Sequence, residues 1–81
     1  MTRADTQRLL DALEPGHSIR VQVLRRRTGE VTAAVVAWRG EHTLRPTEAD
    51  ALRDLVAAAY RVRRLPLPPE LDAPASLPGV R

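Results

Sequence analysis

The segment from Ser18 to Trp38 constrains the fold most, because its pattern predicts two β-strands joined by a tight turn. In its first half, apolar and polar residues alternate, which is the period of a strand with one buried face. Its second half, from Val31 to Trp38, is almost continuously apolar and rich in β-branched residues. Such a run is typical of a central strand covered on both faces. The first strand carries Ile19, Val21 and Val23 on its apolar side, and Arg20, Gln22 and Arg26 on its polar side.

The pairing of these two strands follows from keeping their apolar residues on one face, since opposed residues in an antiparallel pair point the same way. An even-length loop centred on Thr28-Gly29 keeps them together, whereas a three-residue loop shifts the pairing and sets Ile19 against Arg39. We therefore predict an even-length loop, in which Gly29 supplies any positive φ. The predicted pairs are Val23 with Ala34, Val21 with Val36, and Ile19 with Trp38.

One helix is predicted on each side of this hairpin. The first covers residues 2–14, with Thr2 and Asp5 placed as a capping pair, and is ended by Pro15-Gly16. The second begins after Thr47, an N-cap residue followed by acidic residues that suit the positive end of the helix dipole, and it is closed by Leu65-Pro66. Both helices carry an apolar stripe at helical spacing. The stripes are Thr6, Leu9, Leu10 and Leu13 in the first helix, and Leu52, Leu55, Val56, Ala59 and Val62 in the second.

The residues that follow the hairpin permit a short third strand. A turn at Gly40-Glu41 returns the chain and sets Leu44 opposite Ala37. The order of elements then predicts a small α+β domain over residues 1–64, built as helix, β-hairpin with a possible short third strand, and helix. Residues 65–81 form a proline-rich, extended C-terminal arm.

The C-terminal arm holds five of the seven prolines, which predict irregular or polyproline-II chain. Its leucines exceed what a solvated linker needs, so we assign them to partner binding. Residues 63–69 also match the loose pattern of a basic residue before two spaced prolines, which aromatic grooves recognise. Because this composition produces such matches by chance, we prefer an arm docked on its own domain or on a neighbour. The assigned residues are Leu65, Leu67, Leu71 and Leu77.

The chain has 81 residues and no cysteine, so it can form one small domain without disulfides. A core of this size supplies little net stability, which favours support from a protein partner or a second copy. No segment has the pattern of a membrane span or a signal peptide, so we expect a cytoplasmic protein. All thirteen basic residues are arginine, which is typical of a GC-rich bacterial genome or its phages, and the net charge is only +3.

The sequence offers no pattern typical of an enzyme. His17 and His42 are the only histidines, and their spacing from Glu14, Glu30 and Glu41 matches no metal-ligand motif. No phosphate-binding loop, nucleophile elbow or carboxylate pair on one helix face is present. We therefore predict no catalytic, metal or cofactor site.

Arginines near the hairpin tip raise the alternative of nucleic-acid binding, because a basic β-ribbon can contact phosphates. The candidate arginines, which are named at the end of this paragraph, can form one patch only if they share a face. Arg45 would extend this patch under the same condition. Trp38 and Tyr60 are the only aromatic residues, so the chain lacks a platform for stacking bases. The candidate residues are Arg20, Arg25, Arg26, Arg27 and Arg39.

From these patterns we expect a small non-enzymatic interaction or assembly protein that self-associates or docks on a larger complex. A structural or accessory protein of a phage would fit this description. Nucleic-acid binding by the arginine-rich hairpin is the alternative, and no cofactor or membrane is expected in either case.

Overall fold

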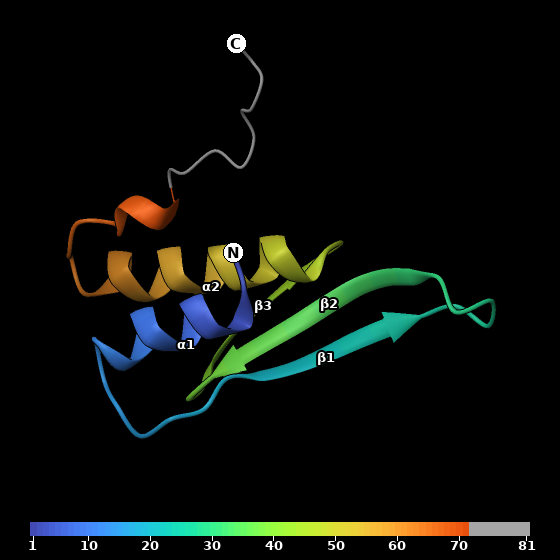
Figure 1. The fold of residues 1–81 in the computed structure, drawn as a ribbon, viewed down its shortest axis with the longest axis horizontal. Helices are drawn as coiled ribbons and strands as arrows, with labels where there is room; N and C mark the ends of the chain where they lie inside the picture. The colour runs from blue at the N-terminus through green and yellow to red at the C-terminus, as the bar shows by residue number, and fades with distance from the viewer. Residues whose placement is uncertain (72–81) are drawn as a thin grey trace, which may run out of the picture.

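The computed structural model describes residues 1–71, in which two helices pack over a three-stranded antiparallel sheet in the order β1-β2-β3 (Figure 1). The α+β class and the helix–strands–helix order predicted from the sequence are therefore confirmed. Leu77, one of the predicted partner-binding residues, lies outside the described residues. The elements are α1 (Arg3–Asp11), β1 (Arg20–Arg25), β2 (Val31–Trp38), β3 (Glu41–Arg45), α2 (Glu48–Val62) and the 3₁₀ turn η1 (Pro69–Leu71).

Helix α1 begins as the sequence predicts but ends earlier. The hydroxyl of Thr2 accepts a hydrogen bond from the N–H of Asp5 at 3.0 Å, which caps the first turn. At the other end, the chain leaves the helix after Asp11, although the N–H of Glu14 still donates to the carbonyl of Leu10. Its buried residues are Thr6, Leu9 and Leu10, as the predicted stripe requires.

The β1–β2 hairpin has the predicted pairing in its core, but its loop differs from the prediction. The N–H of Arg26 donates to the carbonyl of Glu30, which closes a three-residue loop, and Gly29 has a positive φ of 92°. The prediction of an even-length loop was therefore wrong. Leu24 faces Ala33 and Arg25 faces Val31, so Thr32 is an extra residue in a β-bulge. This bulge restores the pairs Val23 with Ala34 and Val21 with Val36.

The third strand forms, with a register that differs from the prediction by two residues. Trp38 pairs with Glu41, so the turn consists of Arg39 and Gly40 and lies one residue earlier than predicted. Arg39 adopts a φ of 58° to make this turn. Leu44 is consequently opposite Val35 and not Ala37, but it keeps the same face, because side chains alternate with a period of two.

Helix α2 is capped by Thr47, whose hydroxyl accepts from the N–H of Asp50 at 3.2 Å. The predicted stripe is confirmed except for Val62, which is 70% exposed. Tyr60 is buried in its place and donates from its hydroxyl to the carbonyl of Leu9 at 2.9 Å. This hydrogen bond ties the end of α2 to α1. The buried residues of α2 are Ala51, Leu52, Leu55, Val56, Ala57, Ala59 and Tyr60.

After α2 the chain reverses and packs on the helices. Arg64 has a φ of 57°, and the N–H of Leu65 donates to the carbonyl of Tyr60, which is the hydrogen bond of a Schellman C-cap. Pro68 is buried, and Leu71 is only 4% exposed. Residues 65–71 are therefore docked on their own domain, with a short 3₁₀ turn where only extended chain was predicted.

The two faces of β2 differ in cover. Ala34, Val36 and Trp38 are fully buried on the helical side, whereas the alternate residues 33, 35 and 37 are only half-buried on the other side. The two helices and residues 65–71 lie on one side of the sheet. The described part of the chain therefore covers only one of the two faces for which the apolar pattern of this strand predicts cover. Within residues 1–71, no helix has the length and apolar character needed to cross a membrane.

Candidate functional site

The side of the sheet opposite the helices is the candidate site, and we call it the open face. Strand registers arrange its side chains in rows that cross the sheet from β1 to β3. One end of the face is polar and the other is apolar. The first row holds Arg20, Ala37 and His42, the second Gln22, Val35 and Leu44, and the third Leu24 and Ala33.

Two leucines make the apolar end of the open face accessible. Leu24 is 39% exposed and Leu44 is 53% exposed, and the half-buried Val35 lies in the row that ends at Leu44. No residue in the three rows is acidic. The open face therefore offers apolar contact at one end and positive charge from Arg20 at the other.

A shallow hollow of about 310 Å³ lies beside β1 on this side of the sheet. It is lined by Arg20, Val21, Gln22, Val35 and Ala37. In residues 1–71, β2 is the only strand that pairs with β1, so the outer edge of β1 has no partner strand. The hollow and the unpaired edge are thus next to each other.

Arg25, Arg26 and Arg27 lie at the tip of the β1–β2 hairpin. This tip projects beyond the helices (Figure 1). Arg25 donates to the carbonyl of Gly29 at 3.0 Å, and Arg26 forms an ion pair with Glu30 at 3.4 Å. Arg20 lies five residues before Arg25 in the same strand, which corresponds to roughly 17 Å. The tip and Arg20 are therefore two separate basic points on one strand.

Arg39 belongs to neither point, because it lies in a cluster at the base of the hairpin. The guanidinium carbons of Arg39 and Arg63 each lie 5.4 Å from the centre of the Trp38 ring. Glu14 forms an ion pair with Arg39 at 3.4 Å and contacts His17 at 2.9 Å. We call these five residues the basal cluster. The basal cluster is formed by residues that are far apart in the sequence. The sequence therefore contained no indication of it beyond the short spacing of Glu14 and His17.

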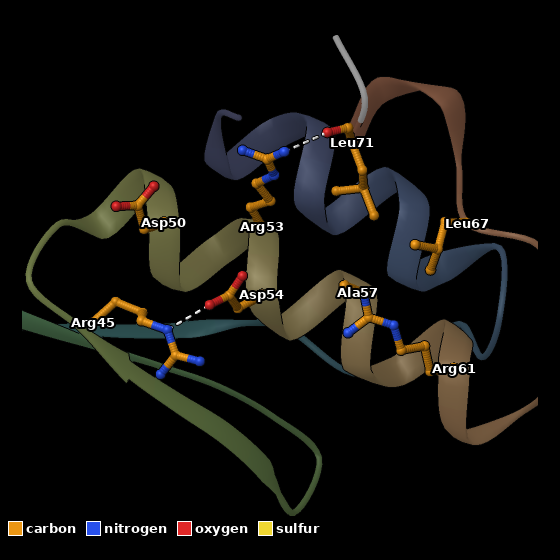
Figure 2. A pocket seen from close by; sticks show the side chains of 8 residues that line it. All are labelled: Arg45, Asp50, Arg53, Asp54, Ala57, Arg61, Leu67 and Leu71. Atoms are coloured by element: carbon orange, nitrogen blue, oxygen red, sulfur yellow. Dashed lines mark hydrogen bonds and ion pairs between the residues drawn. The ribbon is translucent and has the colours of Figure 1, made fainter. Parts of the chain in front are cut away.

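The structure separates Arg45 from the other arginines as well. It bonds to Asp54, as Figure 2 shows. Both residues line a groove of about 400 Å³ that also includes Leu67 and Leu71. In the same groove, Arg53 donates to the carbonyl of Leu71 at 2.8 Å. The contact of Arg53 with Leu71 shows that residues 67–71 dock along one side of this groove. The lining residues are Arg45, Asp50, Arg53, Asp54, Ala57, Arg61, Leu67 and Leu71.

The leucines assigned to partner binding have different surroundings. Leu71 is buried in the core of its own domain, and Leu67 is half-buried against that core. Leu65 is 45% exposed. Among the described leucines of the arm, Leu65 therefore offers the most surface to another molecule.

Three shifted pKa values mark contacts that hold the helical side together. The hydrogen bond from Arg3 lowers the pKa of Glu48. The pKa of Glu70 is lowered first by its own backbone N–H and then by the side chain of Arg8. Burial raises the pKa of Tyr60. These shifts have structural causes, since they arise where α1, α2 and the arm meet.

Among residues 1–71 no group of three or more histidine, aspartate or glutamate side chains is placed to hold a metal ion. His17 lies in the basal cluster, whereas His42 lies on the open face. Comparisons of this chain with protein-family models, with curated proteins and with solved structures find no match.

Proposed function

We propose that this chain is a cytoplasmic, non-enzymatic interaction protein that docks on a partner protein, in an assembly, through the open face. The observation that carries the proposal is the exposure of Leu24 and Leu44 on the side of the sheet that the helices leave uncovered. A small domain gains stability and specificity when such a surface is covered. The exposed Leu65 of the arm would add a second contact.

Protein binding explains the open face better than nucleic-acid binding does. Apart from Gln22, the second and third rows consist of alanine, valine and leucine, and they contain no aromatic side chain on which a base could stack. The arginines that could contact phosphates are spread over the tip, the open face and the basal cluster. Exposed apolar side chains with charge beside them suit a protein–protein interface, whose core is apolar and whose rim is polar.

Nucleic-acid binding by the hairpin tip remains a second candidate, because three consecutive arginines project there with only Glu30 to balance them. Arg27 is exposed and forms no ion pair in the described part of the chain. This candidate predicts binding that weakens steeply with salt, since phosphate contacts release counterions.

A photo-cross-linking amino acid at Leu44 tests the proposed function in cells that produce the chain. The matched control is the same amino acid at Val62, which is also an exposed apolar residue but lies on α2. We expect a protein adduct from position 44 and none from position 62. Equal adducts from both positions, or no protein adduct at 44, would contradict docking through the open face.

The same cross-linked samples distinguish protein docking from nucleic-acid binding. Adducts that are sensitive to nuclease, and that are lost when Arg25, Arg26 and Arg27 are replaced by Gln, would favour nucleic-acid binding by the tip. Adducts that persist after nuclease treatment and in this triple variant would favour protein docking.

A further inference from the structure

We propose that the partner supplies an acidic, extended segment that adds as a fourth strand to the free edge of β1. This inference rests on the proposed function and specifies the chemistry of the partner. Strand addition to a sheet edge gives affinity through the main chain and specificity through alternate side chains.

The edge of β1 offers the required hydrogen-bonding groups. In an antiparallel pair, every second residue directs its N–H and carbonyl away from the neighbouring strand. In the described chain nothing but β2 pairs with β1, so the outward groups along Arg20–Arg25 have no strand partner. The edge of β3 is shorter, and there the carbonyl of Leu44 already accepts from the Arg45 side chain at 2.7 Å. Edge β1 is thus the better template.

The charge of this edge selects the partner. Residues 18–27 contain four arginines and no carboxylate. Arg20 forms no ion pair with the described residues, and it stands at the polar end of the open face. An added strand would place its own side chains beside Arg20 at one end of β1 and Arg25 at the other. Acidic side chains at these positions would complement the edge.

The apolar positions of the added strand follow from the open face. Side chains of a strand paired with β1 would alternate between the open face and the helical side. Those on the open face would lie beside Gln22 and Leu24 and next to the hollow that reaches Val35. The predicted segment therefore has an acidic residue near each end and Val or Thr, which favour strands, between them. The acidic residue beside Arg20 lies on the open face, and the one beside Arg25, an odd number of positions away, lies on the helical side.

A second copy of the chain is a poorer occupant of this edge. Pairing two copies through β1 would bring the arginines of both strands together without a carboxylate between them. Basic side chains on an edge strand discourage such self-pairing. An acidic partner reverses the sign of this interaction, and the exposed Leu24 then gains an apolar contact.

The test uses the full chain and a synthetic peptide of about eight residues, a typical strand length, with one Glu near each end, about five positions apart, and Val and Thr between them. A peptide with Lys in place of Glu controls for charge. A Glu peptide methylated on alternate backbone nitrogens controls for strand pairing, because it keeps the charge but cannot donate. Binding is followed by amide chemical shifts and by hydrogen exchange of β1.

Arg20→Glu combined with Arg25→Glu should reverse the preference. The wild-type chain should bind the Glu peptide about fivefold to tenfold more tightly than the Lys peptide, and the double variant should prefer the Lys peptide. The matched control is Arg61→Glu with Arg64→Glu, which changes the charge equally on exposed residues at the end of α2. This control should bind like the wild type. Circular dichroism checks that each variant is folded.

Protection of β1 amides by the Glu peptide alone supports strand addition. The proposal is overturned if the methylated peptide binds equally well, if the shifts map elsewhere, or if neither peptide binds. It is also overturned if a DNA duplex, used as a second anionic probe, displaces the peptide and shifts only the hairpin tip. Because a protein adduct at Leu44 would survive each of these results, failure of the strand proposal is distinguishable from failure of the proposed function.

Discussion

The two faces of β2 have almost the same composition and opposite surroundings. Ala34, Val36 and Trp38 point to the helices and are fully buried, whereas residues 33, 35 and 37 are alanine, valine and alanine and are half-buried. The difference comes from what covers each face. Helices of nine and fifteen residues, with part of the arm, cover one side of the sheet. An apolar strand therefore predicts that both of its faces can be buried. The amount of helix in the chain decides whether one face or both are covered.

The two sides also differ in how polar groups are used. On the helical side, Tyr60 bonds to Leu9, Arg53 to Leu71 and Arg8 to Glu70, so polar contacts lock the elements together. On the open face, Arg20 has no ion-pair partner among the described residues. The helical side is thus organised for stability, and the open face is available for binding. Five substitutions or conditions test this division.

Trp38→Ala should have the largest effect, because it removes the largest fully buried side chain on the helical side. We expect a loss of about 3–5 kcal/mol in the free energy of unfolding, enough to unfold much of so small a domain. Urea denaturation followed by far-UV circular dichroism measures it. A loss below about 1 kcal/mol, the size seen at surface positions, would show that the helical side is not the core.

A comparison of Leu71→Ala with Leu65→Ala tests which residues of the arm belong to the core on the helical side. Leu71 is 4% exposed and Leu65 is 45% exposed, although both lie in the arm. We expect Leu71→Ala to cost about 2–4 kcal/mol and Leu65→Ala less than about 1 kcal/mol. Chemical denaturation of both variants gives the comparison. Equal losses would mean that the arm does not dock as described.

Tyr60→Phe should cost about 1–2 kcal/mol, because the buried carbonyl of Leu9 loses its hydrogen-bond donor while the ring is kept. Denaturation of the variant at neutral pH measures this. Burial raises the pKa of Tyr60, so the contribution of the neutral phenol is present below the ordinary pKa and is lost as the pH rises through the folded value. An ordinary phenol titration in the folded protein would contradict the buried contact.

Acid should weaken the helical side through Glu70. Its pKa is lowered in the folded chain, so its contribution is present above the unfolded pKa and is lost as the pH falls through the folded value. Glu70→Gln should therefore lower the thermal midpoint slightly at neutral pH, and the difference from wild type should shrink as the pH falls below the ordinary range of glutamate. A difference that persists in acid would assign the effect to packing. Both side chains of the Arg8–Glu70 pair are exposed, so the effect is small.

Leu24→Thr with Leu44→Thr should have the smallest effect on stability. Both side chains are exposed on the open face, and Thr is well suited to strands. We expect a change within about 0.5 kcal/mol per site, together with loss of partner adducts from a cross-linker placed at the neighbouring Gln22. A large loss of stability would show that the open face belongs to the core.

Local features of the fold could be predicted from the sequence because they depend on neighbouring residues. Thr2 and Thr47 were identified as N-caps, and both accept the expected backbone hydrogen bond. The pairing of Val21 with Val36 followed from keeping the apolar residues on one face. The end of α2 was harder to predict, because Val62 and Tyr60 both fit an apolar stripe and only tertiary packing selects Tyr60.

The candidate site could be predicted only in part. The alternation of Arg20, Gln22 and Leu24 with valines was visible, but the sequence did not show that the helices would leave that side uncovered. The sequence left open whether the candidate arginines share a face. In the structure, the turn at Arg39 directs that side chain to Trp38. Long-range contacts of this kind leave no local pattern.

The bulge at Thr32 compensates for the odd number of residues in the hairpin loop. A three-residue loop without the bulge would pair Arg20 with Val36 and turn the arginine toward the helices, with Val21 and Val23 sent to the other side. The single extra residue corrects this. Sequences that gain or lose one residue in the tip can therefore keep the same sheet surface by losing or gaining a bulge, so the length of the tip can vary while the open face stays the same.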